Sequence, residues 1–212
     1  MVGQINRGSA RGELIYELSK DKHNTVFVEI GTWNGAGSTR CFMDAILERP
    51  DDSILYSIES CTIRYEQATN YWKFKLLPYK KPKLSLLLGR IIESSQVSTP
   101  KEVIESGLTP QHPDWKKWHE ADIATYSECP NIYSELPLDI DVLLLDGGEF
   151  CSYAEWEKLR SRTKIVLLDD TNVFKNHRVK EELSQSKEWT LLADCSNENN
   201  NGFLAYKKIE LE

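Results

Sequence analysis

The stretch that decides the fold is VFVEIGTWNGAGSTR, which occupies residues 26 to 40 of the 212-residue chain. Its first residues are apolar and β-branched at alternating positions, which predicts a strand, and the strand ends at a glycine cluster. Apolar residues resume at helical spacing from residue 41, so a helix follows the turn. The amides at the start of this helix, capped by Ser38 or Thr39, attract polar or anionic ligand groups. This order is typical of a loop that binds a nucleotide-type cofactor.

The spacing of Gly31, Gly35 and Gly37 does not by itself identify the cofactor. A dehydrogenase loop that binds a nicotinamide cofactor has the same form, and a plain structural turn is a further reading. The rest of the chain has to discriminate between them.

Composition restricts the class of partner. The formal net charge is -7, and no block of lysine or arginine is longer than a short pair. Such a chain is poorly suited to nucleic acid or to an acidic membrane surface. No apolar run approaches the roughly 20 residues that span a bilayer, and the first residues lack an apolar signal core. We therefore expect a cytoplasmic protein with no nucleic-acid and no membrane partner.

The remaining periodic segments predict one domain over residues 1-212. Five β-α units followed by a hairpin predict an α/β fold. Its sheet is Rossmann-like, doubly wound, mostly parallel and seven-stranded, with an antiparallel C-terminal hairpin. The turn of that hairpin is the asparagine-rich run at residues 196–201. The sequence leaves open whether this domain is excised from a longer polypeptide and fused to other domains.

One segment interrupts the pattern. Residues 98-137 contain five prolines and are expected to form an irregular lid or substrate-binding excursion. Trp115 and Trp118 in this segment can stack on a pyranose ring or on adenine, or can lie on one packed helical face.

Acidic residues close four of the predicted strands. In open α/β sheets, ligands bind beyond the carboxyl ends of the strands, where the strand order reverses. The acids therefore meet at the expected ligand edge, and they are Glu29, Glu59, Asp146, Asp169 and Asp170.

With this arrangement, the chain resembles the class I S-adenosylmethionine-dependent methyltransferases over nearly its whole length. The run from Glu29 to Gly35 is similar to the first motif of that family, and Glu59 stands where the family binds both ribose hydroxyls. The resemblance implies S-adenosyl-L-methionine as the cofactor. The cofactor-binding residues that it implies are Glu29, Gly31, Thr32, Trp33, Gly35, Ser38, Glu59, Ser60, Gly89, Arg90 and Asp146.

Within the family, the sequences around Asp146 and Asp169 resemble the small metal-dependent O-methyltransferases of the catechol, caffeoyl-coenzyme A and macrolide-sugar types. This resemblance implies that Asp146, Asp169 and Asp170 hold Mg²⁺ or Mn²⁺. The chain departs from the catechol and plant enzymes at Glu149, where those enzymes have a lysine. A histidine that other relatives have near this position is also missing. The candidate catalytic residues are therefore Asp146, Glu149 and His177.

The expected activity is transfer of a methyl group to a hydroxyl of a small molecule or glycan, with a sugar favoured as acceptor. Two alternatives stay open at this point. An NAD(P)-dependent short-chain dehydrogenase fits the glycine loop, although residue 157 is glutamate where Tyr153 would need a lysine four positions on. A non-catalytic Rossmann-like binding module fits the fold alone.

Overall fold

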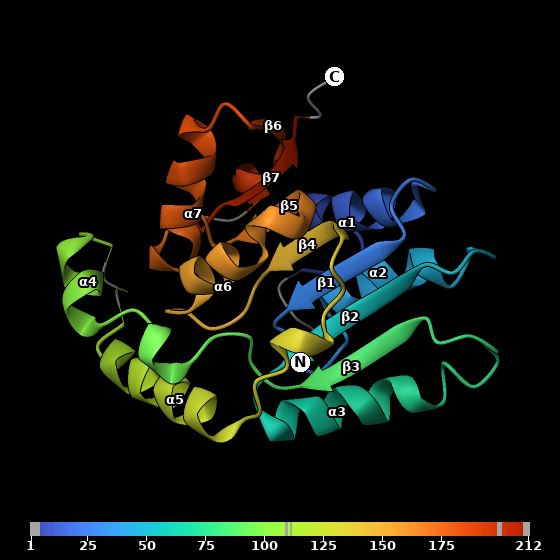
Figure 1. Ribbon diagram of the computed structural model, residues 1–212, viewed down its shortest axis with the longest axis horizontal. Coiled ribbons are helices and arrows are strands. Elements are labelled where there is room, and N and C mark those ends of the chain that lie inside the picture. Colours follow the sequence, from blue (N-terminus) through green and yellow to red (C-terminus); the bar gives the residue numbers. More distant parts are fainter. Residues whose placement is uncertain (1–4, 109, 111, 199–200, 210–212) are drawn as a thin grey trace.

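The computed structural model describes residues 5–108, 110, 112–198 and 201–209, and residues 199 and 200 of the predicted hairpin turn lie outside this part. A seven-stranded sheet runs through its centre (Figure 1). The strands are β1 (Val26–Ile30), β2 (Ile54–Glu59), β3 (Leu84–Leu88), β4 (Ile140–Leu145), β5 (Thr163–Asp169), β6 (Trp189–Asp194) and β7 (Phe203–Lys208). The α-helices are α1 (Ala10–Lys20), α2 (Ser38–Ile46), α3 (Thr62–Lys73), α4 (Pro100–Glu105), α5 (Trp115–Glu128), α6 (Ser152–Leu159) and α7 (Phe174–Gln185).

The strand order is β3-β2-β1-β4-β5-β7-β6. Strands β1 to β5 are parallel to their neighbours, whereas β7 is antiparallel to both β5 and β6. The predicted doubly wound sheet with a reversed terminal hairpin is thereby confirmed. The strand order reverses between β1 and β4, so this is the point where the fold leaves room for a ligand.

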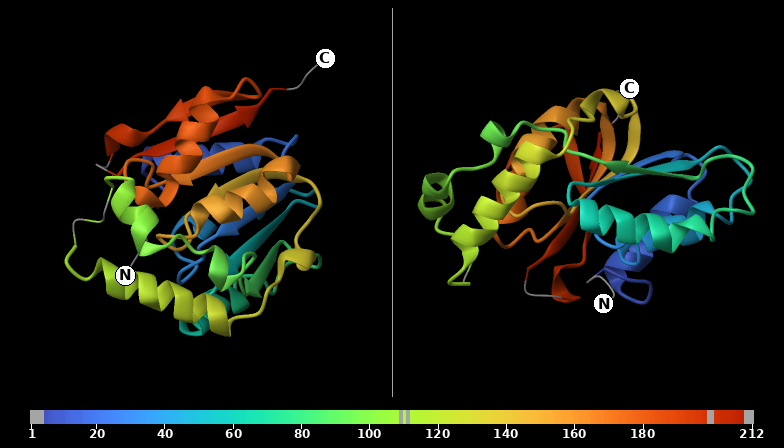
Figure 2. Two further views of the ribbon diagram at one scale, coloured as in Figure 1. Left: turned by 60° about the vertical axis from the view of Figure 1, so that its left-hand side comes forward. Right: turned by 90° about the horizontal axis from the view of Figure 1, so that it is seen from below.

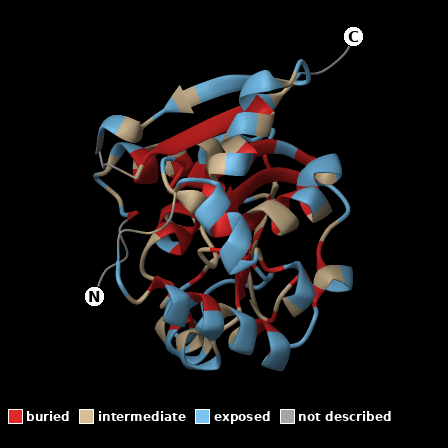
Figure 3. Cartoon of the chain, turned by 90° about the vertical axis from the view of Figure 1, so that its left-hand side faces the viewer, coloured by how far each residue is buried: buried red, intermediate tan, exposed pale blue. Residues whose placement is uncertain are grey.

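Helices cover both faces of the sheet, with α5, α6 and α7 on one face and α1, α2 and α3 on the other (Figure 2). Alternate residues of each central strand point to opposite faces, and both sets are apolar, as expected of a parallel sheet that is covered on both sides. The inner strands are buried between the two helical layers, and the outer surfaces of the helices are exposed (Figure 3). Within the described residues, none of the helices has the length and apolar character needed to cross a membrane.

The segment at residues 98–137 is more regular than expected. It contains α4, which begins with a Thr99 and Glu102 capping box, and the 14-residue helix α5. Ser98 N donates to Phe150 O at 2.9 Å, which ties the start of the segment to the rest of the domain, and within the segment His119 Nε2 lies 2.7 Å from Ser98 O. The excursion is therefore a packed helical layer beside the ligand edge.

The turn after β1 requires glycine at position 31. Gly31 has φ +102°, and a Cβ atom added there would lie 2.2 Å from the backbone oxygen of Asp146. We expect Gly31→Ala to lower the free energy of unfolding by about 2–4 kcal/mol, because it combines a strained φ with a backbone clash. Chemical denaturation measures this loss.

Gly107→Ala is the matched control. Gly107 also has positive φ, +72°, but a Cβ atom there would have nothing within 4 Å. Its alanine variant should lose only about 1 kcal/mol, from the φ angle alone. Equal losses in the two variants would show that the approach of β1 to β4 is not the constraint.

Candidate functional site

A buried carboxylate, that of Glu29, holds the ends of the glycine loop between β1 and α2. Glu29 is fully buried and accepts hydrogen bonds from the hydroxyls of Ser38, Thr39 (2.7 Å) and Ser57 (2.6 Å). Burial raises the pKa of Glu29, and the three hydroxyl donors oppose the rise. Ser38 or Thr39 was expected to cap α2, but both hydroxyls donate to Glu29, and the N-cap position is Gly37.

A cavity of about 520 Å³ opens at the carboxyl ends of β1 to β5, at the reversal of strand order. Most of the residues expected at the site line it, namely Gly31, Trp33, Glu59, Ser60, Gly89, Arg90, Asp146, Glu149, Asp169 and Asp170. The other expected residues are not among its lining residues, namely Glu29, Thr32, Gly35, Ser38 and His177. His177 lines a separate cavity and lies 3.2 Å from Glu181. A role for these five in ligand binding or catalysis stays a prediction.

Glu59 at the end of β2 is held in place by backbone amides. Its Oε2 accepts from Trp33 N at 2.7 Å, and its Oε1 accepts from Cys61 N at 2.9 Å. Burial raises its pKa, while these amide donors lower it. Because each carboxylate oxygen has two lone pairs, Glu59 can accept further hydrogen bonds from a ligand in the cavity.

Arg64 and Arg90 line the same side of the cavity. The Arg64 guanidinium lies 3.7 Å from the centre of the Trp33 ring. The backbone of Trp33 has φ +53°, which is unusual for a residue other than glycine. Arg90 donates to the backbone oxygens of Cys129 (3.1 Å) and Ile92 (2.7 Å), so it supports the rim of the cavity.

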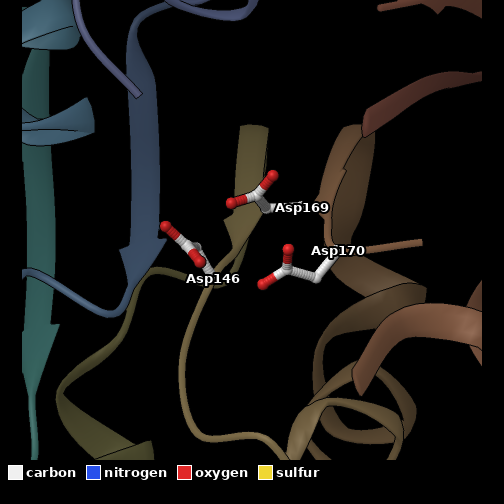
Figure 4. A group of neighbouring side chains, drawn as sticks. All are labelled: Asp146, Asp169 and Asp170. Atoms are coloured by element: carbon white, nitrogen blue, oxygen red, sulfur yellow. The ribbon is translucent and has the colours of Figure 1, made fainter. Parts of the chain in front are cut away.

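Three aspartates from neighbouring strand ends meet on the opposite side. Carboxylate oxygens of Asp146, Asp169 and Asp170 lie within 4.8 Å of one another and surround a common space (Figure 4). Asp170 adopts φ +59°, a left-handed conformation that turns the chain sharply after β5. One of its oxygens, Oδ1, is buried and makes no hydrogen bond within the described part of the chain.

A lysine that the sequence did not reveal lies among these acids. Lys175 Nζ is 2.6 Å from Asp146 Oδ1 and 3.3 Å from Asp170 Oδ2, and its side chain is 4% exposed. Burial alone would lower the Lys175 pKa, but the carboxylates of Asp146, Asp170 and Glu149 hold it well above its ordinary value. Lys175 is therefore a charged ammonium within the cluster.

The neighbouring residue fixes the position of Lys175. Asn176 Nδ2 donates to Leu145 O at 3.0 Å and to Asp169 O at 2.5 Å. These two bonds clamp the first turn of α7 to the ends of β4 and β5. The third aspartate has its own cation, since Arg11 Nη1 of α1 lies 3.1 Å from Asp169 Oδ1, with both side chains buried.

Carboxylate oxygens are the ligands that Mg²⁺ and Mn²⁺ prefer, so the donor set agrees with the predicted metal site. The charges around the three carboxylates do not agree with a metal site. Two of the three carboxylates already bind the Lys175 ammonium, and the third binds Arg11. With Lys175 in this position, the cluster does not fit a divalent ion.

A second group of acids lies between α5 and α6 and also lines the cavity. Glu155 Oε1 accepts from the Tyr126 hydroxyl at 2.6 Å, while Glu155 Oε2 and Asp122 Oδ2 are buried without a hydrogen-bond partner in the described chain. Burial raises the pKa of Asp122 to about 6 and that of Glu155 to about 7. Asp122 and Tyr126 were missed because α5 was not predicted, although their spacing of four places them on one helical face.

The two tryptophans of α5 lie elsewhere. Trp115 is buried, and its ring packs against Phe150 with centroids 6.2 Å apart. Trp118 is exposed and stacks on His112 at 4.7 Å. Neither is among the residues that line the cavity, so ring stacking on a ligand stays a prediction.

Comparison with known proteins identifies the fold. No protein-family model matches the chain, and no curated protein matches it significantly in sequence. Solved structures match over most of its length. A methyltransferase from Geobacter sulfurreducens has a TM-score of 0.59 and 16% identity, and the match covers 97% of this chain and 80% of that one.

Two further matches contain the cofactor or its product. The O-methyltransferase TomG from Streptomyces achromogenes, in complex with SAM, has a TM-score of 0.60 and 15% identity over 94% of this chain and 80% of that one. An O-methyltransferase from Bacillus cereus, in complex with SAH, has a TM-score of 0.60 and 11% identity over 98% and 84%. The chain therefore has the Rossmann-like fold of these methyltransferases.

The raised pKa of Glu155 makes stability depend on pH. The carboxyl group titrates near 4.5 when exposed and at about 7 when folded, so the folded state holds a proton that the unfolded state has lost between these values. Stability contributed by this group is therefore lost as pH rises from 4.5 to 7, by up to about 3 kcal/mol. Glu155→Gln should remove this loss.

Chemical denaturation at pH 5 and pH 8 tests this expectation. The stability of Glu155→Gln relative to the wild type should rise between these pH values. Glu157→Gln, an exposed change on the same helix, should show no such rise. A similar rise in both variants would contradict the assignment to Glu155.

Proposed function

We propose that this chain is an S-adenosylmethionine-dependent O-methyltransferase that acts on a hydroxyl of a small molecule, most specifically a sugar. The observation that carries the proposal is the division of one cavity into two sides. The glycine loop and Glu59 lie at the ends of β1 and β2, and the aspartates lie at the ends of the adjacent strands β4 and β5, so the strand order places them on two sides of the cavity. A transferase needs this adjacency, because donor and acceptor must meet in one space.

On the cofactor side, the proposed roles follow from position. Glu59 accepts hydrogen bonds from the ribose hydroxyls, and the backbone of the loop at Gly31 approaches the rest of the cofactor. The Trp33 ring and the Arg64 guanidinium close this side of the cavity. The presence of SAM and SAH in two structures of the same fold supports S-adenosylmethionine as the cofactor.

On the acceptor side, a carboxylate receives the proton of the acceptor hydroxyl, and the cavity aligns that hydroxyl with the methyl group. As the hydroxyl proton passes to Asp146 or Glu149, a lone pair of the oxygen attacks the methyl carbon. The carbon–sulfur bond breaks with its electron pair returning to sulfur, which leaves a methyl ether and S-adenosylhomocysteine. Burial raises the pKa of both carboxyl groups, which makes each a stronger base than an exposed one.

A sugar acceptor agrees with the polar character of this side. Carboxylates are acceptors only, so a cavity wall that contains several of them suits a molecule with several hydroxyl donors. The Mg²⁺ or Mn²⁺ expected from the family resemblance stays a prediction. Such an ion, when bound, would lower the pKa of the acceptor hydroxyl, and Asp146, Asp169 and Asp170 would hold it only if Lys175 moved away.

The dehydrogenase alternative lacks support in the cavity. Its chemistry needs a tyrosine with a lysine four residues later. Tyr126 lines the cavity, but residue 130 is proline, and the Tyr126 hydroxyl is bonded to Glu155. Tyr153 is bonded to Glu182 at 3.2 Å and lines a different cavity.

Calorimetric titration with S-adenosylhomocysteine, NAD and NADP distinguishes the three functions. We expect S-adenosylhomocysteine to bind with a dissociation constant in the micromolar range, and neither dinucleotide to bind. Binding of a dinucleotide alone would favour the dehydrogenase. Binding of none of the three would favour a non-catalytic module.

Glu59→Gln tests the ribose contact. The substitution removes the charge and replaces one acceptor oxygen by a donor, so S-adenosylhomocysteine should bind at least about tenfold more weakly, which corresponds to ~1.4 kcal/mol. Glu66→Gln, an exposed change on α3, should bind as the wild type does. The thermal midpoint of each variant checks that the loop is intact, and unchanged affinity in Glu59→Gln would rule out the ribose role.

A further inference from the structure

The aspartate cluster holds a cation that belongs to the chain itself. We infer that the Lys175 ammonium takes the place of a divalent metal ion at the Asp146, Asp169 and Asp170 site, and that this site works without a bound metal. The inference rests on the proposed function for the identity of the reaction. The occupancy of the site by Lys175 stands on contacts alone.

The first argument is the position of the ammonium. Lys175 Nζ bridges Asp146 Oδ1 at 2.6 Å and Asp170 Oδ2 at 3.3 Å. A Mg²⁺ ion requires oxygens at about 2.1 Å in near-octahedral geometry and would need oxygens of the same carboxylates. It would have to share them with a positive charge a few ångströms away, so the two cations compete.

The second argument is charge compensation. Every member of the aspartate cluster has a cationic partner, because Asp169 pairs with Arg11 at 3.1 Å while Lys175 bridges the other two. Buried carboxylates without such partners would repel one another. The role of an ion in holding the cluster together is therefore already filled.

The third argument is rigidity. The Lys175 side chain is 4% exposed and extends from the first turn of α7. Asn176 holds this turn to the ends of β4 and β5 by two hydrogen bonds. An exposed lysine on a loop would leave the cluster easily. Lys175 is instead delivered by an element bonded to the same two strands that carry the acids.

The arrangement also suits an acceptor hydroxyl. An ammonium has three protons, and the contacts with Asp146 and Asp170 use two of them. Lys175 lines the cavity, and Asp170 Oδ1 is buried without a hydrogen-bond partner in the described chain. A hydroxyl that accepts the third proton would lie beside Asp146, which Lys175 contacts at 2.6 Å and which the proposed reaction uses as a base. Lys175 would then stabilise the acceptor oxygen as its proton leaves.

Binding of Mn²⁺, followed by electron paramagnetic resonance of the free ion, tests the inference without an acceptor. We expect the wild-type protein with S-adenosylhomocysteine to show no saturable binding in the millimolar range. Lys175→Met keeps most of the length of the side chain and removes its charge, so it should bind one Mn²⁺ at least about tenfold more tightly than the wild type. Mn²⁺ should also raise the thermal midpoint of Lys175→Met but not that of the wild type.

Lys187→Met is the matched control, because it removes one exposed lysine charge beyond the end of α7. It should bind Mn²⁺ as weakly as the wild type. Saturable wild-type binding that Lys175→Met does not tighten would overturn the inference, as would a failure of both proteins to bind. The wild-type titration stays decisive against tight metal binding even if Lys175→Met does not fold.

Calorimetry with S-adenosylhomocysteine on the same wild-type sample separates this inference from the proposed function. Loss of that binding would overturn the methyltransferase proposal and leave the Mn²⁺ result standing. Intact binding together with tight wild-type Mn²⁺ binding would overturn only the role of Lys175.

Discussion

The site depends on the close contact of β1 and β4 at their carboxyl ends. Asp146 N donates to Ile30 O at 3.0 Å, and Gly31 approaches the Asp146 carbonyl so closely that a side chain there has no room. These strands are adjacent although their connections leave in opposite directions, which is the condition for a ligand cavity in an open α/β sheet. The contact places the glycine loop beside the aspartate turn. The glycine loop and the aspartates line one cavity because of this single piece of backbone packing.

Buried carboxylates in this domain are stabilised in two different ways, and the difference separates structure from chemistry. Glu29 is surrounded by three hydroxyl donors from the start of α2 and from β2, and it does not line the cavity. The aspartates are paired with Lys175 and Arg11 and do line it. Neutral donors hold Glu29 as an internal support for the loop. Cations keep the aspartates close together while leaving lone pairs that a ligand can reach.

The sequence predicts the strands and the mostly parallel sheet because each central strand is apolar on both faces and ends at an acid or a glycine. The acids of the site were predicted for the same reason, since strand ends are visible in a pattern. Lys175 was not, because its role depends on where the first turn of α7 docks, and a lone lysine in a polar helix carries no local signal. Asp122 was missed with α5, whose proline-flanked segment was expected to be irregular. The sequence did not predict that the Ser38 hydroxyl donates to Glu29 instead of capping α2, because this depends on the two side chains being buried together.

The aspartate cluster lowers the stability of the fold through backbone strain and lost hydration. Asp170 is held at φ +59°, which costs on the order of 1–3 kcal/mol in strain. Buried ion pairs such as that of Lys175 and Asp146 lose hydration that their attraction does not always recover, and apolar residues of similar size often serve stability as well or better. These costs fall together at one cavity, whose lining also includes Gly31 of the glycine loop. The proposed methyl transfer would use such a concentration of features, because charge must be in place before the acceptor loses its proton. The same reasoning makes Lys175 a part of the site and not of the core.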